Sequence, residues 1–419
     1  MAAVDAAFAM ALPAGKGHLI PEVAQRVSSE LLISLLPAVL RPSSRQFHGE
    51  ALMTLREARE LARRVAAANA PKVELHTHLD GSMTPSTIWR IGQATGFKFP
   101  EDVHNAEGLI PYVTVDHAAS LADFLKTFDF FYPIISGRTA ALAVEMMAEA
   151  FVEQQLADNV IYSEVRFAPQ LLTSENVTSQ MLVDAAWRGL RKGMKGSAVR
   201  VHLILCCYRN LPVAACGDIV ELAAANPEKV VGVDLAGDEM GFSNEPWMVY
   251  FEDLFKRGIH RTVHSGESGT NATRDCETAV TKMHAERIGH GYQCLTSAKA
   301  VDLLRTGQVH IEACPSSSVG THATGQLGPD HPIARFAKLG LSFGLNTDDA
   351  GVLRTNMTHE FERARDLLGF SLAQLRQATE AAAAHVFAPD DEKLILLHEV
   401  RKYWTSIRML AQKSPTLVV

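Results

Sequence analysis

Four short segments of this 419-residue chain place histidines and carboxylates directly after apolar runs. In the first, His76 and His78 alternate near the end of a run that leads to Asp80. Alternate side chains of an extended strand point to the same face, so the two imidazoles can share one metal ion and Asp80 can follow them. Taken alone, so short a motif is more often a pair of ordinary polar or core histidines.

Two further apolar runs also end in a histidine. His264 is followed by Gly266, where glycine allows a sharp turn, and then by Glu267. The imidazole can therefore complete a metal set while Glu267 acts beside it as an acid. His290 lies between two glycines, which pack poorly on a strand and are better explained by close approach of another backbone or a ligand. A structural turn histidine is the alternative.

The fourth segment ends in the neighbouring carboxylates Asp348 and Asp349. Successive side chains of a strand face different directions, so Asp348 can bind a cation while Asp349 contacts a substrate. A solvated turn is the alternative, but a buried carboxylate is costly unless it is paired or coordinated.

Together, three imidazoles and one carboxylate make a nitrogen and oxygen set suited to Zn²⁺ with an open position for water. Iron, cobalt and manganese also fit such a set. A metal lowers the pKa of bound water towards about 7. The sequence shows no glycine fingerprint of a dinucleotide-binding fold, so metal-assisted hydrolysis is favoured over redox chemistry.

The elements that position these residues alternate regularly from Lys72 onward. Near-continuous apolar runs rich in β-branched residues, separated by helical stretches, predict a parallel sheet covered by helices. Eight such runs favour a (β/α)₈ TIM-type barrel, which assembles its site at the carboxyl ends of its strands, over an open doubly wound sheet. The runs are 73–79, 160–168, 199–207, 230–236, 261–264, 287–289, 309–314 and 341–345.

Residues 1–71 are predicted to form an N-terminal helical extension, and residues 72–419 the barrel domain. Apolar positions within 19–40 and 52–68 have helical spacing. Amphipathic helices usually bury one face, so we expect the extension to pack on the barrel or on a second chain. The oligomeric state is not set by the sequence.

Composition limits the class of partner. Forty basic and 47 acidic residues give a net charge of −7, which argues against nucleic acid or an anionic membrane surface. No apolar run is long enough to span a membrane, so the expected partner is a small molecule. The six cysteines form no C-x-x-C pair and are expected to be reduced, mostly buried thiols. The apolar start carries Asp5 and lacks a basic region, which favours a cytoplasmic protein over a secreted one.

In order, these segments resemble the motifs of the adenosine deaminase family, and the likeness runs from about residue 72 to about residue 404. Five ordered motifs are far more specific than any one of them. The resemblance implies a hydrolase with one zinc ion per chain that converts adenosine and 2′-deoxyadenosine to inosine and 2′-deoxyinosine, with release of ammonia, in purine salvage. The motifs are 71–82, 234–239, 264–267, 287–291 and 346–349.

The resemblance also implies a role for each residue. Metal-activated water would attack C6 of the purine, with His290 orienting it and removing its proton, and Glu267 would pass a proton to N1. Asp349 would hydrogen-bond to N7, and the Gly237 backbone N–H to N3. The implied zinc ligands are His76, His78, His264 and Asp348.

By the same resemblance, Asp80 contacts the ribose 5′-hydroxyl. A carboxylate there would repel a 5′-phosphate, so a free nucleoside is favoured over a nucleotide. Deaminases of N6-methyl-AMP commonly carry asparagine at this position. A deaminase of N6-methyl-AMP, 5′-methylthioadenosine or adenine remains an alternative. A growth-factor-like binding protein is a more distant one, because neither a ligand nor Glu267 is lost.

Residues 120–128 are predicted to form one helix with an apolar face of Leu121, Phe124, Leu125 and Phe128. Alone, this pattern is typical of a core face. The family resemblance implies instead a lid that lines the nucleoside pocket and excludes water. Tyr208 is a further, weaker candidate for the pocket wall.

Overall fold

The barrel predicted from the sequence is confirmed in the computed structural model, which describes residues 55–413. Eight parallel strands follow one another in chain order, and every predicted run is a strand whose ends agree within two residues. The strands are β1 (Lys72–His78), β2 (Val160–Phe167), β3 (Arg200–Tyr208), β4 (Val230–Ala236), β5 (His260–Ser265), β6 (Arg287–His290), β7 (His310–Ala313) and β8 (Phe343–Leu345).

The sheet closes between its first and last strands, which excludes the open doubly wound alternative. The His78 N–H donates to the Asp348 carbonyl at 2.9 Å, and the Asp348 N–H donates to the His76 carbonyl at 3.0 Å. Asp348 is the third residue beyond the end of β8. The two segments that meet at this closure, the end of β1 and the segment after β8, therefore both carry predicted site residues.

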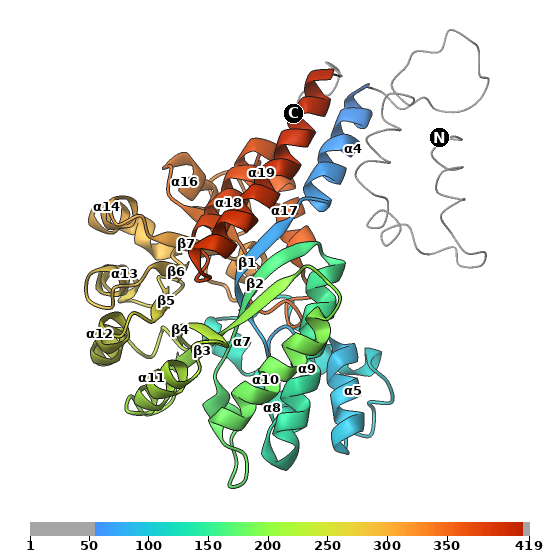
Figure 1. Cartoon of the computed structure of the whole chain (residues 1–419), viewed down its shortest axis with the longest axis vertical. Helices are drawn as coiled ribbons and strands as arrows, with labels where there is room; N and C mark the ends of the chain where they lie inside the picture. Colours follow the sequence, from blue (N-terminus) through green and yellow to red (C-terminus); the bar gives the residue numbers. More distant parts are fainter. Residues whose placement is uncertain (1–54, 414–419) are drawn as a thin grey trace, which may run out of the picture.

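Helices surround the strands, as Figure 1 shows. Strand side chains such as Val165, Leu203 and Val263 are fully buried, as expected for a parallel sheet that helices cover. The outer helices are α9 (Ala140–Ala157), α10 (Ser179–Met194), α11 (Ala215–Ala225), α12 (Met248–Lys256), α13 (Ala272–Thr281), α14 (Ala298–Thr306), α16 (Pro332–Lys338), α17 (Met357–Asp366) and α18 (Leu372–Ala384). Additional helices include α5 (Pro85–Thr95), α15 (Pro315–Gly320) and the long C-terminal α19 (Asp390–Lys413).

One helix of the predicted extension lies within the described residues. This helix, α4 (Leu55–Ala68), packs against α17 and α18, and the Tyr403 hydroxyl of α19 donates to the Ala66 carbonyl at 2.7 Å. The helix predicted within 19–40 lies outside the described residues. The domain division at residue 71 stays a prediction.

The single helix predicted over 120–128 was wrong. The structure has two helices, α7 (Leu121–Leu125) and α8 (Phe128–Ile135), which Lys126 and Thr127 separate. The Ser120 side chain caps α7 by accepting from the Asp123 N–H. At the other end the Thr127 N–H donates to the carbonyl three residues back, which tightens the last turn and redirects the chain.

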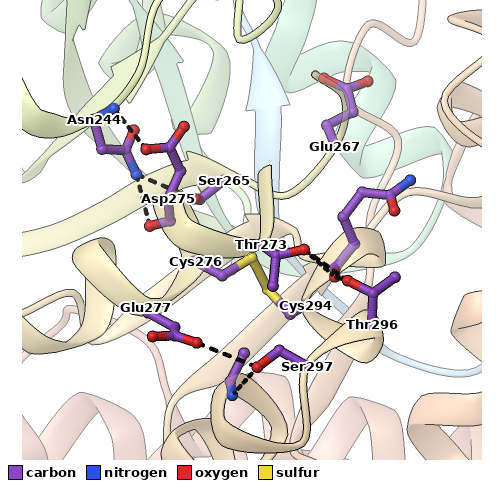
Figure 2. The surroundings of a disulfide bond; sticks show 12 residues. Asn244, Ser265, Glu267, Thr273, Asp275, Cys276, Glu277, Cys294, Thr296 and Ser297 are labelled. Carbon is purple, nitrogen blue, oxygen red and sulfur yellow. Dashed lines mark hydrogen bonds between the residues drawn. A yellow bond between two sulfur atoms is a disulfide. The ribbon is translucent and has the colours of Figure 1, made fainter. Parts of the chain in front are cut away.

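The expectation of six reduced cysteines was also wrong for four of them. Cys207 and Cys216 form a disulfide, because the turn from β3 into α11 brings their Cα atoms to 4.9 Å. A second disulfide joins α13 to the 3₁₀ turn after β6 (Figure 2) and pairs Cys276 with Cys294. Disulfides are rare in the cytosol, so this finding weighs against the expected cytoplasmic location. Among the helices of residues 55–413, none is apolar over enough length to cross a membrane.

Candidate active site

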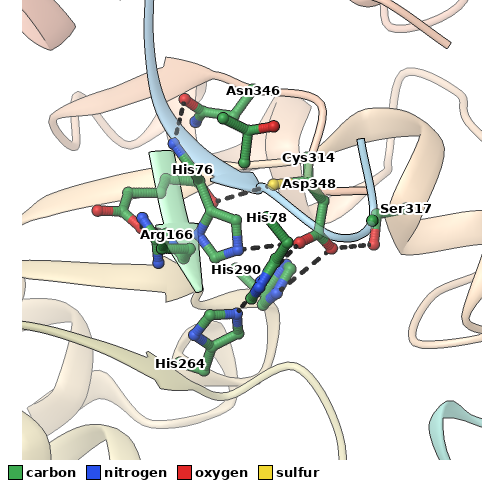
Figure 3. A network of polar contacts seen from close by, with 12 residues as sticks. His76, His78, Arg166, His264, His290, Cys314, Ser317, Asn346 and Asp348 are labelled. Atoms are coloured by element: carbon green, nitrogen blue, oxygen red, sulfur yellow. Dashed lines mark hydrogen bonds and ion pairs between the residues drawn. The ribbon is translucent and has the colours of Figure 1, made fainter. Parts of the chain in front are cut away.

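Polar side chains from separate strands meet at the carboxyl end of the barrel (Figure 3). His76 reaches this cluster from β1, His264 from β5 and His290 from β6. Asp348 reaches it from the segment that follows β8. One ligand atom from each of these four residues lies within 4.8 Å of the others, and all four residues are buried. Parallel strands end on the same side of a barrel, which explains how residues so far apart in the sequence converge.

His78 lies at the edge of the same cluster. Its Nε2 atom is 3.2 Å from Nε2 of His264 and 3.3 Å from Oδ1 of Asp348. His290 comes 3.8 Å from Oδ2 of Asp348. Both imidazoles therefore reach the same centre, and their predicted division into a metal ligand, His78, and a water-orienting base, His290, stays a prediction.

Two of these residues have a backbone conformation that residues other than glycine rarely adopt. His290 has φ = 67° and Asp348 has φ = 65°, in the left-handed region. Such strain persists only where the surrounding structure maintains it, and it is frequent at functional sites. Next to His290, a Cβ on Gly289 would lie 2.7 Å from the His76 ring. It would also lie 3.2 Å from the backbone Cα of His264, so the expected close approach is made by a side chain together with a neighbouring backbone.

Buried carboxylates hold two of the imidazoles from behind. Nδ1 of His76 lies 2.7 Å from Oε2 of Glu312, and Nδ1 of His264 lies 2.8 Å from Oδ2 of Asp234. Arg166 connects the two carboxylates through contacts of 2.9 Å and 3.0 Å. A carboxylate behind Nδ1 favours the tautomer whose Nε2 lone pair points to the centre of the cluster. These supporting residues were not among the predicted site residues.

The donor atoms fit a divalent cation. Burial lowers the pKa of His264 to about 4, so this imidazole is neutral at neutral pH. Nε2 of His264 lies 3.2 Å from Nε2 of His78, and Nε2 of His76 lies 3.1 Å from Oδ1 of Asp348, so the donor atoms of four residues converge on one point that a cation can fill. A site with three or more nitrogen donors and one carboxylate suits zinc and similar metals.

A cavity of about 600 Å³, which includes its open mouth, lies in front of this cluster. All predicted site residues line it except His76, which lies behind the others. The residues of the predicted lid line it in spite of the break between α7 and α8. The predicted residues of the wall are His78, Asp80, Leu121, Phe124, Leu125, Phe128, Gly237, His264, Glu267, His290, Asp348 and Asp349, and the weaker candidate Tyr208 joins them.

Glu267 is held rigidly at the cavity wall. Its backbone N–H donates to Oε2 of Glu239 at 2.9 Å, and Oε1 of Glu267 accepts from the Thr321 hydroxyl at 3.0 Å. Burial, together with the charges of Asp348 and Glu239, raises the pKa of Glu267 well above its usual range. Burial therefore favours the protonated form of this carboxyl group, which lies 3.6 Å from Nε2 of His290. Sequence reasoning quoted Glu239 within a motif but assigned it no role.

Asp349 is a second carboxyl group at the wall whose protonated form is favoured. Burial and the charges of Asp348 and Asp80 raise the pKa of Asp349 well above its usual range. Its Oδ1 atom has no hydrogen-bond partner among the described residues. A Cβ on Gly81 would lie 1.7 Å from this atom, so glycine is required there. A buried, unpartnered carboxyl group calls for a partner on a bound ligand.

Comparison with known proteins assigns this site to a family. A family model described as adenosine deaminase matches residues 71–403. Adenosine deaminase of Bos taurus is 37% identical over 350 residues, which cover 79% of this chain and 93% of that protein. The Xenopus laevis enzyme is 35% identical over 350 residues, with 80% and 96% covered. The chain belongs to the adenosine deaminase family.

Solved structures of two deaminases and one amidohydrolase share the fold. Adenine deaminase from Arthrobacter aurescens has a TM-score of 0.73 at 24% identity and covers 80% of this chain and 99% of its own. The N6-mAMP deaminase of Arabidopsis scores 0.70 at 24% identity, with 80% and 99% covered. An amidohydrolase from Burkholderia ambifaria with bound Zn scores 0.72 at 21% identity, with 89% and 96% covered.

Family membership confirms the resemblance drawn from the five motifs. As an adenosine deaminase family member, the chain is a hydrolytic deaminase of purine metabolism. The family is metal-dependent, and the clustered histidines and aspartate agree with that requirement.

Proposed function

We propose that this adenosine deaminase family member acts on free adenosine and 2′-deoxyadenosine and holds one zinc ion per chain. The proposal rests on one observation above all: a neutral imidazole, a buried carboxyl group whose ionisation is disfavoured and a convergent set of metal donors meet at one cavity. Glu267 lies 3.6 Å from Nε2 of His290, which in turn lies 3.8 Å from Oδ2 of Asp348.

His76, His78, His264 and Asp348 would hold the metal. A zinc ion in such a site polarises a water molecule and lowers its pKa towards about 7. The carboxylates behind His76 and His264 orient these imidazoles for ligation, as outer partners of metal ligands commonly do. The Burkholderia ambifaria protein, which shares the fold, was solved with zinc and supports this choice of metal.

The other wall residues would bind the base and move protons. Burial lowers the pKa of His290 well below its usual value, so this neutral imidazole can accept a proton from the attacking water. Glu267 carries the proton that N1 of the purine needs as the ring loses aromaticity. Asp349, whose protonated form burial favours, would donate to N7, and the Gly237 N–H would donate to N3.

The cavity wall favours a nucleoside over a nucleotide. Neither a lysine nor an arginine is among the described residues that line the cavity. Phosphate recognition normally uses such cations or a cluster of backbone N–H groups at a helix end. Instead, the Asp80 carboxyl lies in the wall, where it can accept from a sugar hydroxyl and where a 5′-phosphate would be repelled.

Deamination of a related 6-aminopurine is the alternative. The similar folds of an adenine deaminase and an N6-mAMP deaminase show that one barrel serves several such substrates. The wall contains Asp80, the expected partner of a ribose hydroxyl, in addition to the residues expected to bind the base, which favours a complete nucleoside over a free base. Acceptance of 5′-methylthioadenosine as a substrate depends on the surroundings of Asp80.

An ultraviolet assay tests the proposal. Purified protein with measured zinc content would be offered adenosine, 2′-deoxyadenosine, AMP, adenine and N6-methyl-AMP separately. We expect the spectral change of deamination with the two free nucleosides. Faster turnover of AMP, N6-methyl-AMP or adenine than of adenosine would contradict the proposed substrate class.

A further inference from the structure

A hydrogen bond in the cavity wall connects two segments that are distant in the sequence. The Tyr132 hydroxyl, on α8, donates to Oδ2 of Asp80 at 3.1 Å. Both residues line the cavity that also contains Glu267 and Asp349. Sequence reasoning did not select Tyr132, because it lies outside every quoted motif.

Tyr132 is the main external restraint on this carboxylate. The other oxygen of Asp80, Oδ1, accepts from the backbone N–H of Gly81 at 3.2 Å. Within residues 55–413, no other side chain donates a hydrogen bond to Asp80. The direction of Oδ2 therefore depends on a hydroxyl that belongs to a different element of the fold.

The carboxylate keeps capacity for a ligand. An ionised carboxylate offers about four acceptor positions, and these two contacts use only two of them. Asp80 is buried, so an additional hydrogen bond to it is made largely out of water and is stronger for that reason. A hydroxyl group on a bound molecule is the complementary donor.

We propose that Tyr132 is a positioning residue that orients Asp80 towards a free 5′-hydroxyl and thereby sets preference at the 5′ end of the nucleoside. This inference rests on the proposed function and goes further, because it assigns the specificity to a contact between α8 and the second residue after β1. Groups that bind a ligand with precision depend on such supporting hydrogen bonds.

The test compares adenosine with 5′-deoxyadenosine, which lacks only the hydroxyl in question. Tyr132→Phe removes the phenol hydroxyl and keeps the ring. We expect kcat/KM for adenosine to fall about tenfold, mainly through KM, as for loss of a hydrogen bond to a charged group. For 5′-deoxyadenosine we expect kcat/KM to change little, so that the ratio between the two substrates moves towards one.

A double variant tests whether Tyr132 acts through Asp80. Asp80→Asn alone should lower the preference for adenosine, and Tyr132→Phe should add little to it in that background, because residues that share one interaction are not additive. Tyr132→Leu, which also lacks the hydroxyl, provides the same comparison if the phenylalanine variant folds poorly.

Tyr112→Phe is the matched control. The Tyr112 hydroxyl donates to Oδ2 of Asp102 at 2.6 Å, and its ring stacks on Phe130 of α8, but Tyr112 does not line the cavity. This variant removes a tyrosine–aspartate hydrogen bond beside the same helix, and the ratio between the two substrates should not change.

Three results would overturn the inference. Equal losses for the two substrates would assign Tyr132 to the packing of α8, and an unchanged kcat/KM for adenosine would remove it from recognition. Full additivity with Asp80→Asn would show that it does not act through the carboxylate. If the wild-type protein fails to deaminate adenosine, the proposed function itself fails; normal wild-type turnover with any of these three results contradicts the Tyr132 inference alone.

Discussion

The surroundings of Glu267 disfavour ionisation of its carboxyl group. It is buried, and Asp348 and Glu239 add negative charge nearby. Two backbone N–H groups, from Glu267 and Ser268, donate to Glu239, so the turn that carries the acid has little freedom. A raised pKa and a fixed position are the two properties that a general acid needs near neutral pH.

Glu267→Gln should retain the metal and lose turnover. The amide occupies the same space but has no acidic proton to deliver, so we expect kcat to fall by about 10²- to 10⁴-fold. Elemental analysis and the ultraviolet assay on one preparation measure the two properties together. Turnover close to that of the wild type would remove Glu267 from the role of acid.

His264→Ala should lose metal and activity together. The substitution removes one donor and leaves the Asp234 carboxylate, which lies 2.8 Å from the imidazole, facing an empty position. We expect metal content per chain to fall well below that of the wild type. His260→Ala is the control, because His260 lies on the same strand but at its start, where it is half exposed and contacts Glu286. Full metal occupancy in His264→Ala would contradict the ligand assignment.

Sequence reasoning found the residues that end strands and missed those that support them. A histidine or aspartate directly after an apolar run is visible in a single sequence. Arg166, Asp234 and Glu312 lie inside β2, β4 and β7, and only their three-dimensional contacts reveal that they hold the histidines. A charged residue within an apolar strand is costly to bury without a partner. The presence of a charge at such a position was therefore the feature of the sequence that could have identified these supporting residues.

At the scale of elements, the second disulfide lies directly beneath the turn that leads to Glu267. A Cβ on Gly266 would lie 2.5 Å from Sγ of Cys276 and 3.2 Å from Sγ of Cys294. The Gln293 N–H donates to the Gly266 carbonyl at 2.8 Å. The bridge between α13 and the turn after β6 therefore supports the segment that leads to Glu267, as Figure 2 shows.

Thiol labelling tests the two disulfides. Denatured, unreduced protein should bind iodoacetamide at Cys206 and Cys314 only, and at all six cysteines after reduction. Peptide mass spectrometry identifies the labelled residues. Six labelled cysteines before reduction would show that the chain carries no disulfide.

Replacing the second disulfide should reduce stability. The bridge spans 18 residues, and closure of a loop of about this size contributes roughly 3 kcal/mol to the free energy of unfolding. Urea unfolding of the Cys276→Ser, Cys294→Ser double variant measures the loss. Cys206→Ser is the control for replacing a buried sulfur that is not bridged.

The elements themselves were predicted unequally. Strand periodicity and β-branched residues specified all eight strands, because a buried parallel strand needs a continuous apolar run. The break between α7 and α8 left no mark on the apolar spacing, since Phe128 reaches the cavity from the second helix as it would from a single one. Cysteine pairing depends on distances across the fold, which sequence spacing does not give.

At the scale of the whole molecule, one buried glutamate near the barrel closure links stability to pH. Oε1 of Glu74 accepts from the backbone N–H of Thr347 at 3.1 Å, while Oε2 has no hydrogen-bond partner among the described residues. Burial raises the pKa of Glu74 from 4.5 to about 7. Between these two pH values the folded chain binds a proton that the unfolded chain has released, so stability falls as pH rises.

Glu74→Gln should weaken this dependence. The amide oxygen can still accept from Thr347, but the group no longer titrates. From pH 5 to pH 8, we expect the wild type to lose up to about 3 kcal/mol more unfolding free energy than the variant. Urea unfolding at both pH values measures the difference, and Glu175→Gln, at an exposed position, should behave like the wild type. Equal slopes in the wild type and Glu74→Gln would contradict the assignment.

The hydrogen bonds that close the barrel join the backbones of His76 and His78 to that of Asp348. The proposed metal ligands themselves therefore form the backbone pairing that closes the sheet. Binding of the metal ion should therefore stabilise the pairing of β1 with the segment after β8, in addition to completing the site. In hydrogen–deuterium exchange, chelation should accelerate amide exchange at His78 and Asp348 more than at Val165 and Leu203, which lie deep in the neighbouring strands β2 and β3. Equal acceleration of exchange at all four amides would show that the metal does not specifically stabilise the closure of the barrel.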